Sequence, residues 1–292
     1  MDWINKNTVL IVGLGLMGGS YAMALKRLGY HVVAIDVDRD SVEYAEKNGI
    51  IDRGYTSVDG DAVGEADAAI FALYPGVFLE WIKKYQNFFK TGLRITDVTG
   101  VKSCIVYDIQ KELRPDVEFI AAHPMAGREV SGVRNSDDRI FRDANYIVVP
   151  TEKNTTEAVD WCRSLGQILG FRKISVLSPE EHDEMIGFVS QLTHCIAVSL
   201  MTCSDNTHLA DFTGDSFRDL TRIARINDVM WSELFMMNRE ALLRHMDTFI
   251  DEMTAFRDLL YRGDTEGMRE KMRLSTQRRA IFDVTQQGGN KK

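Results

Sequence analysis

The chain has 292 residues, 45% of them hydrophobic and 27% charged, which is typical of a globular protein with one or two domains. A net charge of −8 at pH 7 argues against nucleic acid or an anionic membrane as a general partner, so an anionic substrate would need a local basic pocket. The four cysteines form no CxxC pair and no metal-ligand spacing, which favours reduced thiols in a cytoplasmic protein without a metal site. Neither a basic leader nor an apolar run near the roughly 18 residues of a membrane span is evident, so we expect no membrane partner.

The stretch from Thr8 to Ser20 predicts a nucleotide-binding turn. A short apolar strand over 9–12 runs into the pattern GxGxxG, and a helix follows it to Gly29. The first glycine permits a tight turn, the second lets the backbone approach a pyrophosphate, and the third lets helix and strand pack closely. The helix N-terminus then favours the anion. We therefore expect the cofactor to contact Gly13, Leu14, Gly15, Leu16, Met17 and Gly18.

Asp36 follows a second predicted strand over 31–35 and lies 18 residues beyond Gly18. A carboxylate at this place can accept hydrogen bonds from both ribose hydroxyls of NAD and would repel the 2′-phosphate of NADP. Arg39 is close enough in the sequence to keep NADP open as an alternative. The pattern predicts a dinucleotide-binding fold and favours NAD.

Apolar strands and amphipathic helices alternate along the next part of the chain. We expect strands at 67–73, 93–97, 117–122, 145–150 and 173–177, and helices at 40–48, after Pro75, at 101–113 and at 157–169. This alternation predicts an α/β domain with a doubly wound, Rossmann-type sheet over residues 1–177. Ligands of such sheets bind beyond the carboxyl ends of the strands, which singles out the loops Leu73-Tyr74-Pro75, 97–100 with Thr99, and 123–127.

From Ser178 onward the pattern becomes helical. Ser178-Pro179-Glu180-Glu181 predicts a capping box, and helices are expected around 184–204, 216–226, 228–261 and 264–284. We predict an all-helical domain over 178–284 that binds substrate and forms a homodimer, and a polar tail over 285–292. The alternative is that these helices pack back on the sheet domain of the same chain.

Three features of the sequence are candidates for chemistry. His123, at the end of a predicted strand and before Pro124, is placed to polarise a hydroxyl whose carbon gives up a hydride, or is a structural loop histidine. Ser190 and His194 share one helix face. Arg218, Arg222 and Arg225 also share a face and could bind carboxylates, although such rows are usually solvated. His182-Asp183 is expected to be structural and to face away from His194.

Together these motifs resemble the prephenate dehydrogenase family of tyrosine biosynthesis, which includes arogenate dehydrogenases. The resemblance covers nearly the whole chain and is carried by the start GLGLMGGS, by Ala122-His-Pro-Met-Ala-Gly127, by the segment 190–194 and by Phe217-Arg-Asp-Leu-Thr-Arg-Ile-Ala224. It implies oxidation of prephenate by NAD⁺ with loss of CO₂. It also implies that His123 takes the proton of the ring hydroxyl and that the substrate carboxylates bind to His194 and Arg222. Asp219, Trp231 and Glu129 would support or shape that site.

Two departures from the family pattern fall near the expected site. Thr99-Gly100 stands where relatives commonly have Gly-Ser, and Gln191 and Thr193 replace a histidine and a proline. Prephenate and arogenate remain alternative substrates. Two other functions remain open: another dehydrogenase of the β-hydroxyacid or imine-reducing type, and a non-catalytic regulator that senses NAD.

Overall fold

The structure is a computed structural model that describes residue 3 and residues 7–287, with side chains to residue 282. It divides into two compact units, residues 1–241 and residues 242–292. This division lies far from the predicted boundary at 177–178, because the helices between residues 179 and 237 belong to the first unit.

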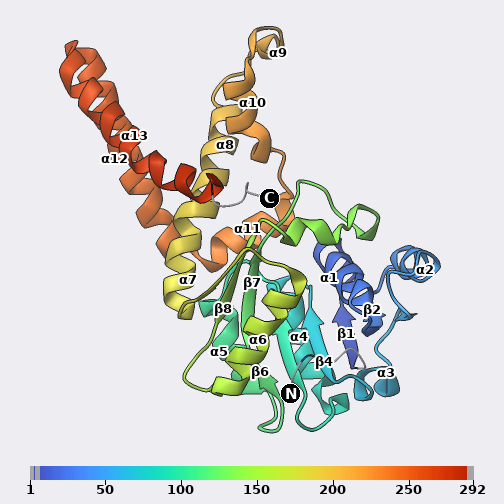
Figure 1. Cartoon of the computed structure of the whole chain (residues 1–292). Helices are drawn as coiled ribbons and strands as arrows, with labels where there is room; N and C mark the ends of the chain where they lie inside the picture. Colours follow the sequence, from blue (N-terminus) through green and yellow to red (C-terminus); the bar gives the residue numbers. More distant parts are fainter. Residues whose placement is uncertain (1–2, 4–6, 288–292) are drawn as a thin grey trace. The chain divides into compact units, whose positions relative to one another are not determined.

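Six parallel strands form the main sheet of the first unit, in the order β3-β2-β1-β4-β5-β6 (Figure 1). They are β1 (Thr8–Val12), β2 (His31–Ile35), β3 (Arg53–Tyr55), β4 (Ala68–Phe71), β5 (Arg94–Asp97) and β6 (Glu118–Phe119). The order reverses between β1 and β4, so their carboxyl ends flank a crevice where nucleotides bind in such sheets. The doubly wound fold predicted from the sequence is confirmed.

Helices cover both faces of this sheet. They are α1 (Leu16–Arg27), α2 (Arg39–Lys47), α3 (Gly60–Gly64), α4 (Pro75–Tyr85) with the 3₁₀ turn η1 (Gln86–Phe88), α5 (Ser103–Glu112) and α6 (Thr156–Leu169). The buried strand β1 sends Val9 and Ile11 into one apolar core and Leu10 and Val12 into the other. This alternation follows from the period of two along a strand.

A second sheet of three strands contains His123. It consists of β7 (Ala121–Met125), β8 (Asn145–Val149) and β9 (Lys173–Val176), with β7 antiparallel to β8 and β8 parallel to β9. The predicted strand 117–122 is in fact divided: β6 pairs with β5, and β7 leaves the main sheet to pair with β8. His123 therefore lies in the middle of a strand of another sheet, and not at the end of a strand of the main sheet. The connection from β7 to β8 contains the 3₁₀ turns η2 (Val133–Asn135) and η3 (Asp138–Phe141).

A helical layer follows β9 in the first unit. It comprises α7 (Pro179–Ile186), the π-helical turn η4 (Gly187–Leu192), α8 (Thr193–Thr202), α9 (Leu209–Phe212), α10 (Asp215–Thr221), the 3₁₀ turn η5 (Arg222–Ala224) and α11 (Asp228–Met237). The predicted capping box is present, with Ser178 and Glu181 bonded to each other's backbone N–H groups.

The continuous helical stretch Pro179–Thr202 is long and apolar enough to cross a membrane by length and composition, with a mean hydropathy of 1.4. The sequence had predicted no such segment. Core helices of soluble proteins pass the same criterion. Only 28% of its apolar window is buried in the single chain, but its polar side chains His182, Asp183 and Gln191 are buried and hydrogen-bonded within the first unit.

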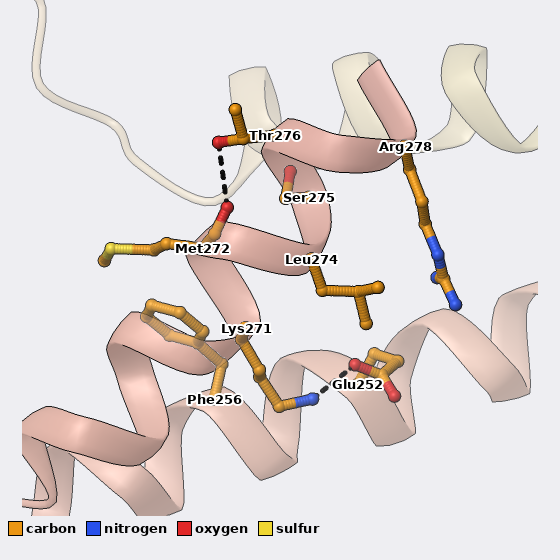
Figure 2. A pocket seen from close by; sticks show the side chains of 8 residues that line it. All are labelled: Glu252, Phe256, Lys271, Met272, Leu274, Ser275, Thr276 and Arg278. Carbon is orange, nitrogen blue, oxygen red and sulfur yellow. Dashed lines mark hydrogen bonds and ion pairs between the residues drawn. The ribbon is translucent and has the colours of Figure 1, made fainter. Parts of the chain in front are cut away.

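The second unit is made by most of α12 (Arg239–Arg262) and by α13 (Thr265–Gln287), joined by a tight turn at Gly263. The two helices lie side by side, and Figure 2 shows the ion pair of 2.6 Å between Lys271 and Glu252 that connects them. The predicted helix 228–261 is interrupted at Asn238, between α11 and α12. Of the predicted polar tail, residues 285–287 belong to α13, and residues 288–292 lie outside the described residues.

Candidate active site

The glycine turn between β1 and α1 has the geometry of a phosphate cradle. Gly13 has a φ of 97°, in the left-handed region that favours glycine. A Cβ added at Gly18 would lie 1.8 Å from the Gly13 carbonyl oxygen, so α1 packs on the turn too closely for any side chain. A Cβ added at Gly15 would instead meet no protein atom within 4 Å. The space above Gly15 therefore suits a phosphate, beside the uncapped first turn of α1 formed by Leu16 and Met17.

Asp36 follows β2 and lies beside this turn. Its carboxylate accepts hydrogen bonds from the N–H groups of Leu14, at 2.5 Å, and of Asp38, at 2.8 Å. A carboxylate offers about four lone-pair sites, so two remain for the hydroxyls of a ribose. Arg39, which left NADP open, is exposed at the start of α2.

The loop Leu73-Tyr74-Pro75 leads from β4 into α4 and contacts α11. The Tyr74 hydroxyl lies 3.4 Å from Nδ2 of Asn227, and the N–H of Gly76 donates to Glu233 at 3.0 Å. Leu73 is partly buried and Pro75 is buried at the first position of α4. The loop and the start of α4 therefore connect the carboxyl end of β4, beside the nucleotide-binding crevice, to the helical layer.

A buried ion pair lies under the loop that follows β5. The side chains of Lys102 and Asp97 are both 0% exposed, and the ammonium donates to Asp97 at 2.7 Å and to the Ala122 carbonyl at 2.6 Å. Thr99 belongs to the same cluster, because its hydroxyl donates to Asp97, accepts from the Lys102 ammonium at 3.0 Å and lies 3.0 Å from the Val101 carbonyl oxygen. The Thr99 side chain therefore faces the ion pair. The hydroxyl of Thr99 is thus engaged within this cluster, and a contact of Thr99 with the cofactor stays a prediction.

His123 is hydrogen-bonded to a second histidine. Its Nδ1 lies 2.9 Å from Nε2 of His182, and Nδ1 of His182 lies 2.7 Å from Oδ1 of Asp183. His182 is fully buried at 0% exposure, and Asp183 also accepts the backbone N–H groups at the start of α5. His182 therefore contacts the candidate catalytic histidine and Asp183 contacts His182, an arrangement that the expectation of a structural pair did not include.

The surroundings hold both histidines neutral at neutral pH. Burial, followed by the charges of His182 and Lys102, lowers the pKa of His123 well below 6.5. Burial also lowers the pKa of His182, although Asp183 opposes this shift. Burial would raise the pKa of Asp183, but the hydrogen bonds that it accepts outweigh burial and lower the pKa. Neutral His123 can accept a proton.

Gly100 lies opposite the other nitrogen of His123. A Cβ added there would lie 3.9 Å from Nε2 of His123 and 3.6 Å from a methyl group of Leu234, which are ordinary contact distances. The site thus has room for a side chain at the position where relatives commonly carry serine, but this chain places no hydroxyl there. Nε2 of His123 faces the loop that follows β5.

His194 packs against Trp231, with ring centroids 3.7 Å apart. Its Nδ1 donates to the Ser190 carbonyl at 2.9 Å, so Ser190 orients this ring through its backbone. Burial lowers the pKa of His194, while the Ser190 carbonyl and Glu129 oppose the shift. Glu129 forms an ion pair with Arg222, whose charge also acts on His194. Glu129, His194, Arg222 and Trp231 therefore form one group.

The predicted row of three arginines is not continuous in the structure. α10 ends at Thr221, so Arg222 begins the turn η5 and Arg225 follows it in extended conformation. Arg218 pairs at the surface with Asp215 at 2.5 Å. Asp219 is exposed on α10, and no hydrogen bond or ion pair among the described residues connects it to the group around Arg222.

Helix α11 connects the parts of the site. Trp231 contacts His194, Glu233 accepts from the start of α4, and Leu234 lies against Gly100 beside His123. Sequence reasoning noted Gln191 only as a departure from the family pattern and missed Asn238, and both residues support these contacts. Gln191 donates to the Leu234 carbonyl at 3.1 Å and accepts from Asn238 at 2.8 Å. No local signal identifies them, because each partner lies more than 40 residues away.

Across the part of the chain that the structure describes, no group of three or more histidine, cysteine or acidic side chains is arranged to hold a metal ion. A groove between α12 and α13, lined by Phe256, Met272 and Leu274 among others, contains none of the site residues discussed above (Figure 2).

Comparison with known proteins identifies the family. Residues 21–174 match the family model "Prephenate dehydrogenase, nucleotide-binding domain", and residues 178–274 match "Prephenate dehydrogenase, dimerization domain". The chain is 31% identical to the prephenate dehydrogenase of Bacillus subtilis over 90% of this chain and 72% of the relative. It is 35% identical to that of Lactococcus lactis over 82% of this chain and 68% of the relative.

A solved structure of a prephenate dehydrogenase is also similar to this chain. The crystal structure of prephenate dehydrogenase from A. aeolicus, in complex with hydroxyphenyl propionate and NAD⁺, is 29% identical with a TM-score of 0.87. The match covers 96% of this chain and 100% of that one. This chain therefore shares its fold with an enzyme of this type over nearly its whole length. This chain belongs to the prephenate dehydrogenase family.

Proposed function

We propose that this protein catalyses the NAD-dependent oxidative decarboxylation of prephenate to 4-hydroxyphenylpyruvate, a step of tyrosine biosynthesis. The observation that carries the proposal is the position of His123. It is a neutral histidine whose Nδ1 is bonded to His182 and whose Nε2 faces the loop after β5, and α11 contacts both this loop, through Leu234, and His194, through Trp231. A base that acts together with a hydride acceptor and a binder of carboxylates suits this reaction.

The residues of the crevice fit NAD. The open space above Gly15 and the uncapped start of α1 suit a pyrophosphate, and Asp36 retains acceptor sites for ribose hydroxyls. Bound NAD⁺ would supply the acceptor for the hydride of the ring carbinol carbon. The carboxylate of Asp36 would repel a 2′-phosphate, which favours NAD over NADP.

His123 handles the proton of the ring hydroxyl. As the hydride leaves, Nε2 of His123 draws this proton and the carbinol carbon becomes a carbonyl carbon. The bond between the ring and its carboxylate then breaks, its electron pair makes the ring aromatic, and the oxygen takes the proton back from His123. No net proton is consumed, because the hydroxyl of prephenate becomes the phenol of the product.

Arg222 and His194 bind the carboxylates in this proposal. The guanidinium of Arg222 is always charged and already holds the carboxylate of Glu129, so the position suits an anion. Nδ1 of His194 donates to the Ser190 carbonyl, so His194 can donate to a carboxylate only as an imidazolium. Burial lowers the pKa of His194 in the free protein, and the negative charge of a bound carboxylate would have to raise this pKa. Trp231 supports the His194 ring and Glu129 positions Arg222. Among the described residues, no hydrogen bond connects Asp219 or the Ser190 hydroxyl to this group, and their place in the substrate site stays a prediction.

L-Arogenate is the alternative substrate, because it differs from prephenate only in an amino group in place of the side-chain keto group. Glu129 is an acidic group near the carboxylate binders that could favour the ammonium of arogenate. We favour prephenate because the relatives with 31% and 35% identity are prephenate dehydrogenases.

NADH formation tests the proposal. The purified protein is assayed with prephenate and with L-arogenate, each with NAD⁺ and with NADP⁺. We expect turnover of prephenate with NAD⁺, and a His123→Asn variant that loses most of kcat while it still binds NAD⁺. His31→Asn, at a half-exposed histidine on β2, is the matched control and should retain activity. A folded protein that binds NAD⁺ and turns over neither substrate would instead be a non-catalytic NAD-binding regulator.

We also propose a cytoplasmic homodimer in which residues 178–284 provide the dimer contacts and the substrate-binding groups, while residues 1–177 bind NAD. The family models divide the chain between residues 174 and 178, and the second is described as a dimerization domain. Apolar side chains such as Met185, Val189 and Met201 are 42–51% exposed on α7, η4 and α8 in the single chain. Light scattering after gel filtration should give twice the chain mass, and a monomer would contradict the proposal.

A further inference from the structure

We propose that Asp183, acting through His182, fixes His123 in the tautomer whose Nε2 carries the lone pair. His182 and Asp183 are then positioning residues of the reaction proposed above, and this inference rests on the role of His123 as its proton acceptor. The structure shows the chain of contacts from Asp183 to His123 directly, and hydrogen-bond chemistry assigns the protons along it.

The assignment starts at the carboxylate. Asp183 is ionised and can only accept, so Nδ1 of His182 must donate across the 2.7 Å contact. A neutral His182 then has a bare Nε2, which accepts from His123 across 2.9 Å. Nδ1 of His123 must therefore carry the ring proton, and Nε2 of His123 is left as the base. This is the logic by which a buried aspartate orients a catalytic histidine, extended by one imidazole.

The carboxylate of Asp183 is itself fixed from several sides. Its Oδ1 accepts from the N–H of Lys102 at 2.9 Å, and its Oδ2 accepts from the N–H of Ser103 at 2.8 Å, at the start of α5. The helix dipole favours a negative charge there. The backbone carbonyl of Asp183 accepts from the side-chain amide of Asn238 at 2.8 Å. The same amide group also donates to Oε1 of Gln191 at 2.8 Å. Asp183 is thus held at its carboxylate and its backbone.

Protonation of His182 would reverse the tautomers. An imidazolium at His182 would donate from Nε2 to Nδ1 of His123, and a neutral His123 would then carry its proton on Nε2, where it cannot act as a base. The ionisable groups that act on the two rings and on Asp183 are Asp97 and Lys102 of the buried ion pair and the Cys104 thiol. Burial, and after it the charge of Lys102, lowers the pKa of His182 and so favours the neutral form that the relay requires.

Nitrogen NMR of the full-length protein tests the assignment without any substrate. The protein is labelled with ¹⁵N at the histidine rings, and the signals of His123 are identified by their loss in His123→Asn. We expect Nδ1 of His123 to be protonated and Nε2 to be bare at pH 7.5. A proton on Nε2 of His123 in the wild-type protein would overturn the inference. This readout does not depend on turnover, so it separates failure of this inference from failure of the proposed function.

Two substitutions of His182 separate the effects of its two contacts, because each keeps one contact and removes the other. His182→Gln can place an amide oxygen near the position of Nε2, and so keeps an acceptor for His123. His182→Asn can keep a donor toward Asp183 but leaves Nδ1 of His123 without its acceptor. We expect kcat to fall about 10- to 100-fold in His182→Asn with a small change in KM, and His182→Gln to recover most of that loss. A merely structural role would lower the melting temperature of both variants and leave the tautomer and the pH profile of kcat unchanged.

Asp183→Asn tests the first contact in the series of hydrogen bonds that runs from Asp183 through His182 to His123. Because the side-chain amide has one acceptor oxygen, and the N–H groups of Lys102 and Ser103 compete for it, the amide nitrogen can face Nδ1 of His182. His182 and His123 then both adopt the opposite tautomer, and kcat falls on the order of 100-fold or more. A folded Asp183→Asn variant with wild-type kcat and an Nδ1-protonated His123 would contradict the inference. If the variant does not fold, the wild-type tautomer and the His182 pair still decide the question.

Discussion

The glycine turn permits a prediction that separates folding from cofactor binding. Replacing Gly18 by alanine would place a methyl group 1.8 Å from the backbone oxygen of Gly13, so helix and turn must move apart by roughly 1 Å. Replacing Gly15 by alanine places the methyl group in open space, and the φ of −74° at Gly15 suits alanine without strain. The first variant should damage the fold, and the second should damage only the cofactor site.

The magnitudes follow from the two environments. Forcing atoms into a packed region costs about 1–3 kcal/mol, and a backbone contact at Gly18 places the cost near the upper end. Alanine regains about 1 kcal/mol of helix propensity, which leaves a net loss of about 2 kcal/mol for Gly18→Ala. At about 2–4 °C per kcal/mol, its melting temperature should fall by roughly 4–8 °C. For Gly15→Ala, we expect a change within about 1 kcal/mol, because the entropic gain in the unfolded chain offsets a poorer N-cap.

For cofactor binding, Gly15→Ala should be the more strongly affected of the two variants. The methyl group of Gly15→Ala occupies the space where a pyrophosphate would lie, and we expect the Kd for NAD⁺ to rise on the order of 10- to 100-fold, or about 1.4–2.7 kcal/mol. Thermal denaturation and titration calorimetry with NAD⁺ measure the two effects on the same samples. The reasoning is refuted if Gly18→Ala melts at or above the wild-type temperature, or if Gly15→Ala binds NAD⁺ as tightly as wild type.

Further predictions concern charge. Asp36→Asn should weaken NAD⁺ binding and relax the preference against NADP⁺ in calorimetry; unchanged NAD⁺ affinity would remove Asp36 from the ribose site. Arg222→Gln should raise KM for prephenate more than it lowers kcat, and an unchanged KM would exclude Arg222 from substrate binding. Lys102→Met leaves Asp97 buried without its cation and should cost about 3–5 kcal/mol in urea unfolding; a loss below 1 kcal/mol would contradict that account. Because the pKa of His123 is lowered on folding, the unfolded chain binds more protons below about pH 6.5, and stability should fall as the pH drops below that value. A melting temperature that rises on acidification from pH 7 to 5 would contradict this sign.

The sequence by itself determined the nucleotide-binding half of the protein. The turn at Gly13, the carboxylate of Asp36 after β2 and the alternation of strands and helices are local patterns, and each has one physical explanation that does not need the rest of the chain. The Ser178 capping box was predictable for the same reason, since its two hydrogen bonds span three residues.

Only the tertiary structure decided the surroundings of His123. A strand is recognisable by its apolar run, but the change of partner from β5 to β8 within 118–125 depends on which strand lies alongside. His123 and His182 are 59 residues apart, and Lys102 and Asp183 are 81 apart, so no local pattern connects them.

The hydroxyl of Thr99 could not be placed from the sequence either, although its partners are only two or three residues away. Its position in the sequence suggested a role at the cofactor, but the buried charge of Lys102 and Asp97 determines where that hydroxyl points. Burying two charges is costly unless hydrogen bonds satisfy them, and this cost arises only when the chain has folded around the ion pair. The sequence thus identified His123 as the group to test, and the folded chain showed the series of hydrogen bonds that runs from Asp183 through His182 to His123.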